Sequence, residues 1–188
     1  MTHYLEIEIL PDPELTVQHI LNALYGRLHR ALVQDGHRDI GVSFPDHNDK
    51  IPSLGRRMRL HGPAEQLQAL MTSSWLRGVH DHLRVLEVSA VPAGAQYRRV
   101  SRVQAKSSPS RLRRRAMRRH GVDEKAALER IPDSAAEHVR LPFVILGSRS
   151  TSQPSFPLFI QHGPLQSELV QGSFNSYGLS QTATIPWF

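Results

Sequence analysis

HYLEIEILPDPELTVQHILNALYGRLHRALV, residues 3–33, decides the fold of the first half of this chain. Within its first eight residues Leu5, Ile7 and Ile9 alternate with Glu6 and Glu8, which predicts a strand with one buried face. Two prolines end this strand. From Glu14 to about Val33 the apolar residues recur every three or four positions, which predicts a helix with one apolar face. Gly36 then closes the helix.

The elements that follow extend this beginning into a known order. Strands are predicted at Ile40–Phe44, Arg57–His61 and Val85–Ala90, and a second helix at Pro63–Leu70. The resulting order, β-α-β-β-α-β, is the ferredoxin-like pattern. We therefore predict an α+β protein whose N-terminal ferredoxin-like domain covers residues 1–92 and ends in a short Pro- and Gly-containing linker.

The second half of the chain reads as a smaller α+β domain over residues 97–188. A helix is predicted at Pro109–His120, with Ser108 as its N-cap and Gly121 just past its end. The closing residues are rich in Gly and Ser and are expected to loop over a strand edge. The other predicted elements are a strand at Tyr97–Ala105, a helix at Asp123–Arg130, and strands at Phe143–Leu146, Leu158–Gln161 and Leu165–Val170.

Positive charge is concentrated in one segment. Ten of the 23 Lys and Arg lie between Arg98 and His120, where there is no acidic residue, and the other 13 are outnumbered by 17 Asp and Glu. Such a concentration of cations is typical of proteins that bind a polyanion, above all nucleic acid. Of the 23 cations 20 are Arg, whose planar fork of donors suits phosphate and base edges.

The predicted helix at residues 109–120 is apolar on one side and purely cationic on the other. Five arginines fall within a sector about 140° wide at about 100° per residue. Nucleic-acid binding is the favoured interpretation, against an acidic protein partner or a membrane surface, and the spacing does not choose between DNA and RNA. The five are Arg111, Arg114, Arg115, Arg118 and Arg119.

Other classes of protein and of site find little support in the sequence. There is no Cys, and no motif for a metal, a nucleotide or another cofactor, so we expect none. No apolar run approaches the length of a membrane span, and the first residues do not resemble a signal peptide. We expect a cytoplasmic protein without membrane association.

Three residues stand out weakly on pattern alone. His29 lies at the edge of the apolar face of the first helix, one turn after Tyr25. Ser148 follows an apolar strand, and Tyr177 lies in the Gly-rich tail. Each has an ordinary interpretation without a functional role, which the pattern alone leaves open.

The whole chain resembles the CRISPR repeat-processing endoribonuclease of the type I-F system. The similarity is carried by YGRLHRALV around His29, IGVSFPD, YRRVSRVQAKSSPSRLRRRAMRRH, LPFVILGSRST and the closing SYGL and PWF. The resemblance implies a ferredoxin-like domain followed by a domain with an arginine-rich helix. It also implies that His29 is the catalytic histidine, that Ser148 is an active-site serine, and that Tyr177 helps to orient the histidine.

The resemblance further divides the RNA-binding residues by role. It implies that Arg102, Gln104 and Arg115 read the hairpin, and that Phe156 stacks on the terminal base pair of the stem. Phosphate contacts are implied for residues of the arginine-rich helix, with Arg111 on the same cationic face. These residues are Arg114, Arg118, Arg119 and His120.

This family's chemistry suits the residues present. RNA carries its own nucleophile, because a 2′-OH that loses its proton can attack the adjacent phosphate and leave a 2′,3′-cyclic phosphate and a 5′-OH. A histidine supplies the base without a metal ion. We therefore expect a metal-independent endoribonuclease that cleaves CRISPR precursor RNA 3′ of the repeat hairpin, stays bound to the product and joins other subunits of a type I-F surveillance complex. The alternatives are a non-catalytic cap on an RNA hairpin and a DNA-binding regulator.

Overall fold

The computed structural model describes residues 1–104, 109–132, 139–147 and 155–188. By its contacts the chain forms two compact units. One combines residues 1–103 with 141–188, and the other is residues 104–140. The sheet of the second half thus packs with the first half of the chain. The domain ranges 1–92 and 97–188 stay a prediction about how the sequence is organised.

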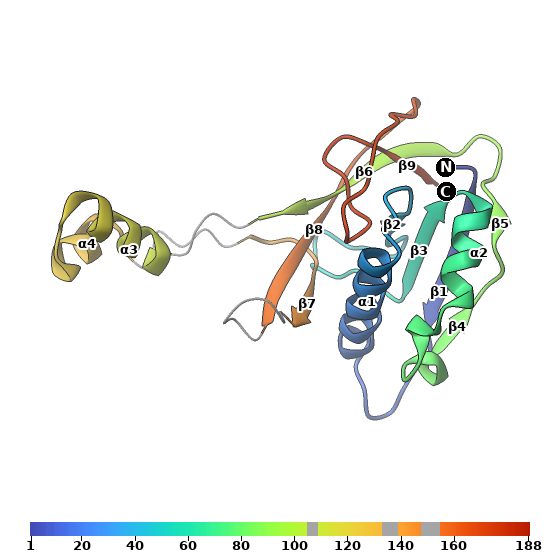
Figure 1. Cartoon of the computed structure of the whole chain (residues 1–188), viewed down its shortest axis with the longest axis horizontal. Helices are drawn as coiled ribbons and strands as arrows, with labels where there is room; N and C mark the ends of the chain where they lie inside the picture. Colours follow the sequence, from blue (N-terminus) through green and yellow to red (C-terminus); the bar gives the residue numbers. More distant parts are fainter. Residues whose placement is uncertain (105–108, 133–138, 148–154) are drawn as a thin grey trace. The chain divides into compact units, whose positions relative to one another are not determined.

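The first half folds as the predicted ferredoxin-like motif. Its sheet is antiparallel with the order β2-β3-β1-β4, and a short further strand also pairs with β1. Two helices pack on this sheet (Figure 1). The elements are β1 (His3–Ile9), α1 (Val17–Gln34), β2 (Gly41–Ser43), β3 (Arg57–Gly62), α2 (Ala64–Thr72), the 3-10 turns η1 (Ser74–Leu76) and η2 (His80–His82), β4 (Leu83–Val85) and β5 (Ser89–Ala90).

The alternation read from the sequence produces the core of this motif. Leu5, Ile7 and Ile9 of β1 are at most 1% exposed. They face the apolar side of α1, whose buried residues are Ile20, Leu21, Leu24, Tyr25, Leu28, Ala31 and Leu32. The face of α1 predicted from the spacing of its apolar residues is therefore confirmed.

Two expectations about element bounds were wrong for local reasons. Helix α1 begins at Val17 instead of Glu14, because the Asp12 carboxylate accepts hydrogen bonds from the amides of Glu14 and Leu15 and holds them in a turn. Thr16 then caps the helix by accepting from the His19 amide. The single strand expected at Val85–Ala90 is two short strands, β4 and β5, both paired with β1.

A second antiparallel sheet forms from the other half of the chain, in the order β7-β8-β6-β9. The expected strands at Leu158–Gln161 and Leu165–Val170 are one strand, β8, which runs through Gly163 because a bulge in β6 between Arg98 and Val100 absorbs the irregularity. The tail also ends in a strand, β9. The elements are β6 (Gln96–Val103), β7 (Phe143–Gly147), β8 (Ser155–Gln166) and β9 (Ile185–Trp187).

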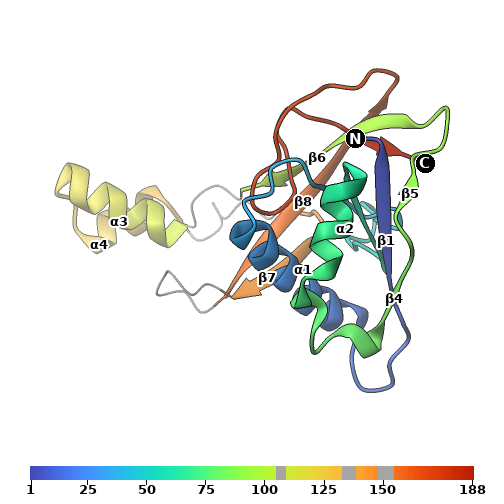
Figure 2. The same ribbon diagram turned by 45° about the vertical axis from the view of Figure 1, so that its right-hand side comes forward.

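Helix α1 lies along the outer strand of this second sheet (Figure 2). The side-chain oxygen of Asn22 accepts the Ile145 amide at 2.9 Å, and the Gln18 side chain donates to the Phe143 carbonyl at 3.0 Å. One turn further, a Cβ on Gly26 would lie 3.7 Å from the Leu146 side chain, so α1 approaches β7 closely there. Side chains of α1 therefore form hydrogen bonds with backbone groups that an edge strand would otherwise leave unpaired.

The two ends of the chain meet at β1 (Figure 1). The Phe188 ring lies edge-on to Tyr4, with 4.8 Å between ring centroids. Arg59, which is 5% exposed and paired with Glu6 at 2.7 Å, donates to the Phe188 carbonyl at 2.9 Å and lies over its ring. These contacts, together with β9, hold the tail that carries Tyr177.

The second unit contains helices α3 (Pro109–His120) and α4 (Glu124–Arg130), which pack on each other. Helix α3 has the bounds predicted from sequence, although its predicted N-cap, Ser108, lies outside the described residues. Asp123 caps α4 by accepting the Ala126 amide at 2.7 Å. Within the described ranges, no helix has the length and apolar character needed to cross a membrane.

Two histidines are buried in the first unit without charge. His61 is 0% exposed, and its Nε2 lies 2.9 Å from the Ser43 hydroxyl. His162 is 6% exposed and stacks on His47, with 3.7 Å between ring centroids. Burial, reinforced by nearby Arg59, lowers the pKa of His61 to about 3. Burial, reinforced by His47 and Arg98, lowers the pKa of His162 to about 2.

These histidines are expected to make the protein sensitive to acid. As the pH falls below about 6.5, these two histidines bind protons in the unfolded chain, whereas His61 and His162 stay neutral in the folded protein. The free energy of unfolding should therefore fall between about pH 6.5 and pH 3, by up to roughly 1.4 kcal/mol per pH unit for each histidine. Urea unfolding at neutral and mildly acidic pH measures this loss.

The matched variants are His162→Phe and His80→Gln. His162→Phe keeps a ring in the stack and removes one titrating group, so it should flatten the pH dependence. His80 has an exposed side chain, and its replacement should leave the dependence as it is. A His162→Phe protein that loses stability in acid as steeply as the wild type would contradict this account.

Candidate functional site

His29 of α1 meets the tail of the chain at a turn. Its Nδ1 lies 2.8 Å from the Ser176 carbonyl oxygen. A carbonyl only accepts hydrogen bonds, so Nδ1 must carry the hydrogen, and in the neutral ring Nε2 then has a free lone pair. The Tyr177 ring stacks on the imidazole, with 4.2 Å between centroids and 17° between planes. The structure thus brings two of the three predicted catalytic residues into contact.

The turn that carries Ser176 and Tyr177 is tightly held. The Asn175 side-chain oxygen accepts from the amides of Tyr177 and Leu179, at 2.9 and 3.2 Å. Gly178 has φ +69°, and a Cβ there would lie 2.3 Å from a Val42 methyl carbon. Only glycine combines that conformation with that close approach. The Val42 amide donates to the Gly178 carbonyl at 2.8 Å, which ties the turn to β2.

The Arg102 side chain lies near two aromatic rings, those of Tyr177 and Phe156. The Arg102 guanidinium carbon is 5.5 Å from the Tyr177 ring centroid and 5.9 Å from that of Phe156. Both distances are within the range of cation–π attraction. The Gln181 side chain donates to the Arg102 carbonyl at 2.7 Å. The resemblance implied a base-stacking aromatic and a base-reading arginine, and the structure places the arginine candidate, Arg102, next to Tyr177 and the aromatic candidate, Phe156, next to Arg102.

Ser148 lies outside the described residues, and so does the rest of residues 148–154. Strand β7 ends at the preceding residue, Gly147, and packs on α1 beside Gln18, Asn22 and Gly26. The assignment of Ser148 as an active-site residue stays a prediction.

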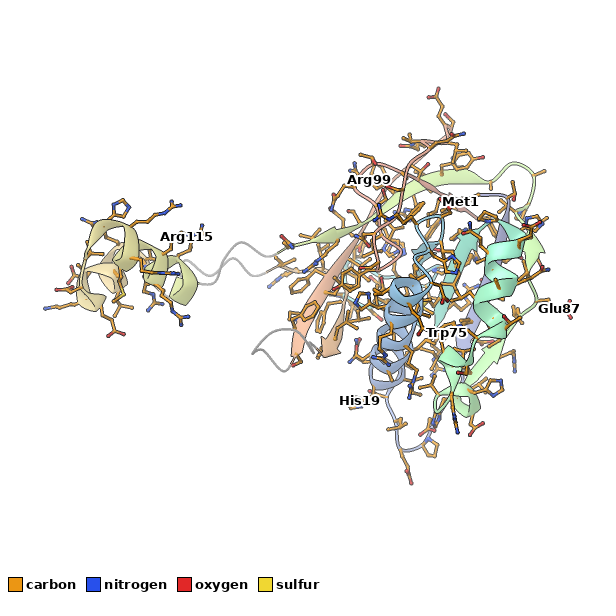
Figure 3. All side chains as sticks on the ribbon, in the orientation of Figure 1. Met1, His19, Trp75, Glu87, Arg99 and Arg115 are labelled. Carbon is orange, nitrogen blue, oxygen red and sulfur yellow. The ribbon has the colours of Figure 1, made fainter. Side chains whose placement is uncertain are left out.

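The remaining predicted contacts follow Arg102 in the sequence. Gln104 is exposed and comes directly after Val103, the last residue of β6. Arg111 belongs to α3, but its side chain is outside the described set. Arg115, labelled in Figure 3, is exposed on α3. Arg114, Arg118, Arg119 and His120 are exposed as well.

The charge of α3 is open to a ligand. Among the described side chains, no carboxylate forms an ion pair with Arg114, Arg115, Arg118 or Arg119. Four like charges on a helix of twelve residues repel one another, and a bound polyanion would relieve that repulsion. As for metals, the described part of the chain holds no group of three or more His, Asp or Glu side chains arranged to bind one.

Comparison with known proteins identifies the family. The sequence model of the family described as CRISPR-associated protein (Cas_Csy4) matches residues 4–188. The chain belongs to the Cas_Csy4 family. A relative from Pseudomonas aeruginosa (strain UCBPP-PA14) is 51% identical over the full length of both chains, and one from Escherichia coli (strain UTI89 / UPEC) is 50% identical over the same span. Both are named CRISPR-associated endonuclease Cas6/Csy4, which confirms the resemblance seen in the sequence.

Three residues that support the site in this Cas_Csy4 protein were not predicted. The Ser176 carbonyl holds His29, Asn175 shapes the turn, and the Tyr25 hydroxyl donates to the Tyr177 carbonyl at 2.7 Å. The sequence carried partial signals for two of them. Asn followed closely by Gly is typical of a turn stabilised by the Asn side chain. Tyr25 stands four positions before His29, on the same side of the helix.

Proposed function

We propose that this endonuclease cleaves CRISPR precursor RNA 3′ of the repeat hairpin, with His29 as the base. The observation that carries the proposal is the hydrogen bond from His29 Nδ1 to the Ser176 carbonyl. It leaves Nε2 free to accept a proton, while the stacked Tyr177 ring restrains the imidazole. A base must be held in one orientation to act on a substrate hydroxyl.

The proposed reaction needs only the RNA and these side chains. His29 Nε2 takes the proton of the 2′-OH, and the 2′ oxygen bonds to the adjacent phosphorus. The bond between phosphorus and the 5′ oxygen breaks with its electron pair on that oxygen, which gains a proton from solvent. The imidazolium returns its proton to solvent, and the products are a 2′,3′-cyclic phosphate and a 5′-OH. Ser148 would hold the 2′-OH in line for attack, and no metal ion takes part.

Recognition would be divided between two surfaces. Arg102, Gln104 and Arg115 would read base edges of the stem, because arginine and glutamine form paired hydrogen bonds with bases. Phe156, already beside the Arg102 guanidinium, would stack on the terminal base pair. The cationic face of α3 would hold the phosphate backbone through Arg111, Arg114, Arg118, Arg119 and His120.

The product hairpin would remain bound to the protein. Because α3 contributes several phosphate contacts that cleavage does not remove, the 3′ end of the guide RNA would stay capped. We further propose that this particle joins other subunits of a type I-F surveillance complex in the cytoplasm.

The experiment that tests this function uses the repeat RNA of the host. The protein is expected to cut it once, at the 3′ foot of the hairpin, leaving a cyclic phosphate and a 5′-OH. A 2′-deoxy substitution at the nucleotide before the cut should block the reaction, because it removes the nucleophile, and EDTA should leave the rate unchanged. Cleavage of the deoxy substrate would rule out this mechanism, and binding without cleavage would mark the protein as a non-catalytic cap.

A further inference from the structure

Helix α1 holds the turn at residues 175–178 with two side chains one helical turn apart. The Tyr25 hydroxyl donates to the Tyr177 carbonyl at 2.7 Å, and His29 Nδ1 donates to the Ser176 carbonyl at 2.8 Å. The two acceptors are consecutive carbonyls of one chain. Residues four apart lie on the same side of a helix, so the spacing of the two donors matches that of the two acceptors.

Tyr25 is fixed more firmly than His29. Its side chain is 0% exposed, and its ring packs against Phe44 with 5.9 Å between centroids. Burial raises the pKa of the Tyr25 phenol above its ordinary value, so the hydroxyl stays protonated and remains a donor. His29 is only partly buried. The hydrogen bond from Tyr25 therefore comes from the more rigid of the two groups.

The hydrogen bond from Tyr25 affects the His29 imidazole through the peptide unit between Ser176 and Tyr177. The Ser176 carbonyl and the Tyr177 amide share a plane, and Asn175 holds that amide at 2.9 Å. Tyr25 holds the next carbonyl. With restraints on both sides, the Ser176 oxygen points at Nδ1 and selects which ring nitrogen of His29 carries the hydrogen.

We propose that Tyr25 is a positioning residue for RNA cleavage, because its hydroxyl fixes the Ser176–Tyr177 backbone that holds His29 with Nε2 free. This role rests on the proposed function, in which Nε2 is the base. Tyr25 itself touches neither the RNA nor the reacting atoms.

Tyr25→Phe removes only the hydroxyl and keeps the buried ring. The single-turnover rate of cleavage should fall about three- to tenfold, the equivalent of one hydrogen bond, while the dissociation constant for the hairpin stays at the wild-type value. The ¹⁵N shifts of the His29 ring, assigned with a His29→Gln variant and recorded at alkaline pH in the free protein, should change from one tautomer to a mixture. Tyr4→Phe, which also removes one hydroxyl, should leave all three quantities unchanged.

A second pair of variants reaches the same backbone without changing the core. Asn175 is exposed, and Asn175→Ala removes the acceptor for the Tyr177 amide, whereas Asn175→Asp keeps an oxygen there. The alanine variant should reproduce the slower rate and the mixed tautomer, and the aspartate variant should restore both. This pair decides the question even where Tyr25→Phe folds poorly.

The outcomes separate this inference from the proposed function. A slower rate together with a mixed tautomer supports the role of Tyr25. A rate that falls with the tautomer unchanged, or a tautomer that changes with the rate unchanged, overturns it. If His29→Ala still cleaves RNA, the proposed function fails, whatever the Tyr25 variant does. If His29→Ala is inactive while Tyr25→Phe has wild-type rate and tautomer, only the inference fails.

Discussion

His29→Ala is expected to slow cleavage of the repeat RNA by about 10²- to 10⁴-fold, the usual contribution of a general base. The reason is the loss of Nε2. The hydrogen bond to the Ser176 carbonyl keeps the hydrogen on Nδ1 and so leaves the Nε2 lone pair free to accept a proton. The affinity for the hairpin should stay near the wild-type value, because the proposed phosphate and base contacts come from other residues. Single-turnover cleavage and filter binding on the same RNA measure the two effects separately.

Two controls make this result specific. His29→Gln keeps a donor near the Ser176 carbonyl but supplies no base, so it should be as slow as the alanine variant. His19→Ala changes an exposed histidine on the same helix and should cleave at the wild-type rate. Loss of RNA binding together with cleavage in His29→Ala would assign this residue to the binding surface instead.

Replacing Arg114, Arg115, Arg118 and Arg119 together by Gln is expected to weaken hairpin binding by about a thousandfold or more, at roughly 1 to 1.5 kcal/mol for each charged contact. The salt dependence should change as well. Each lost phosphate contact lowers the slope of log affinity against log salt by roughly 0.7 to 0.9, or by roughly two to three for the three proposed phosphate contacts Arg114, Arg118 and Arg119. Titrations at several salt concentrations measure affinity and slope together.

The matched control changes net charge equally elsewhere. Arg38, Arg56, Arg77 and Arg84 are exposed on the other unit, and their replacement by Gln should leave affinity nearly unchanged. Arg102→Ala offers a contrast of a different kind. It should alter which base pair at the foot of the stem is preferred while leaving the salt slope in place. If the α3 variant and its control weakened binding alike, general charge attraction would explain both.

Local pattern predicted most of the elements. Helix α3 has its predicted bounds, Pro109–His120, and β1 buries the predicted face. Errors arose where a distant strand overrides local signals. Gly163 and Pro164 read as a break between two strands, yet β8 continues through them because it pairs with the bulged strand β6. Likewise the last residues form β9 only because the edge of β6 is available.

The site depended even more on distant contacts. His29 and Ser176 are 147 positions apart, and nothing in the helical pattern around His29 indicates which tail residue it meets. The resemblance named His29, Tyr177, Arg102 and Phe156, which the structure connects through successive contacts from His29 to Tyr177, to Arg102 and to Phe156. It did not name Tyr25 or Asn175, because their roles arise from backbone carbonyls and amides. Any residue type offers a backbone carbonyl, so sequence does not distinguish Ser176 as an acceptor.

Helix α1 carries several functional and structural residues that are spaced about one helical turn apart. Gln18 and Asn22 cover the edge of β7, Gly26 gives close approach, and His29 reaches the tail. Inserting or deleting one residue within this stretch would rotate every later side chain by about 100° around the helix axis. His29 would then leave Ser176, and the apolar face would leave the core. A substitution changes one of these positions at a time, whereas a change in their spacing would remove stability and catalysis together. We therefore expect the number of residues between Gln18 and His29 to be the same in related proteins.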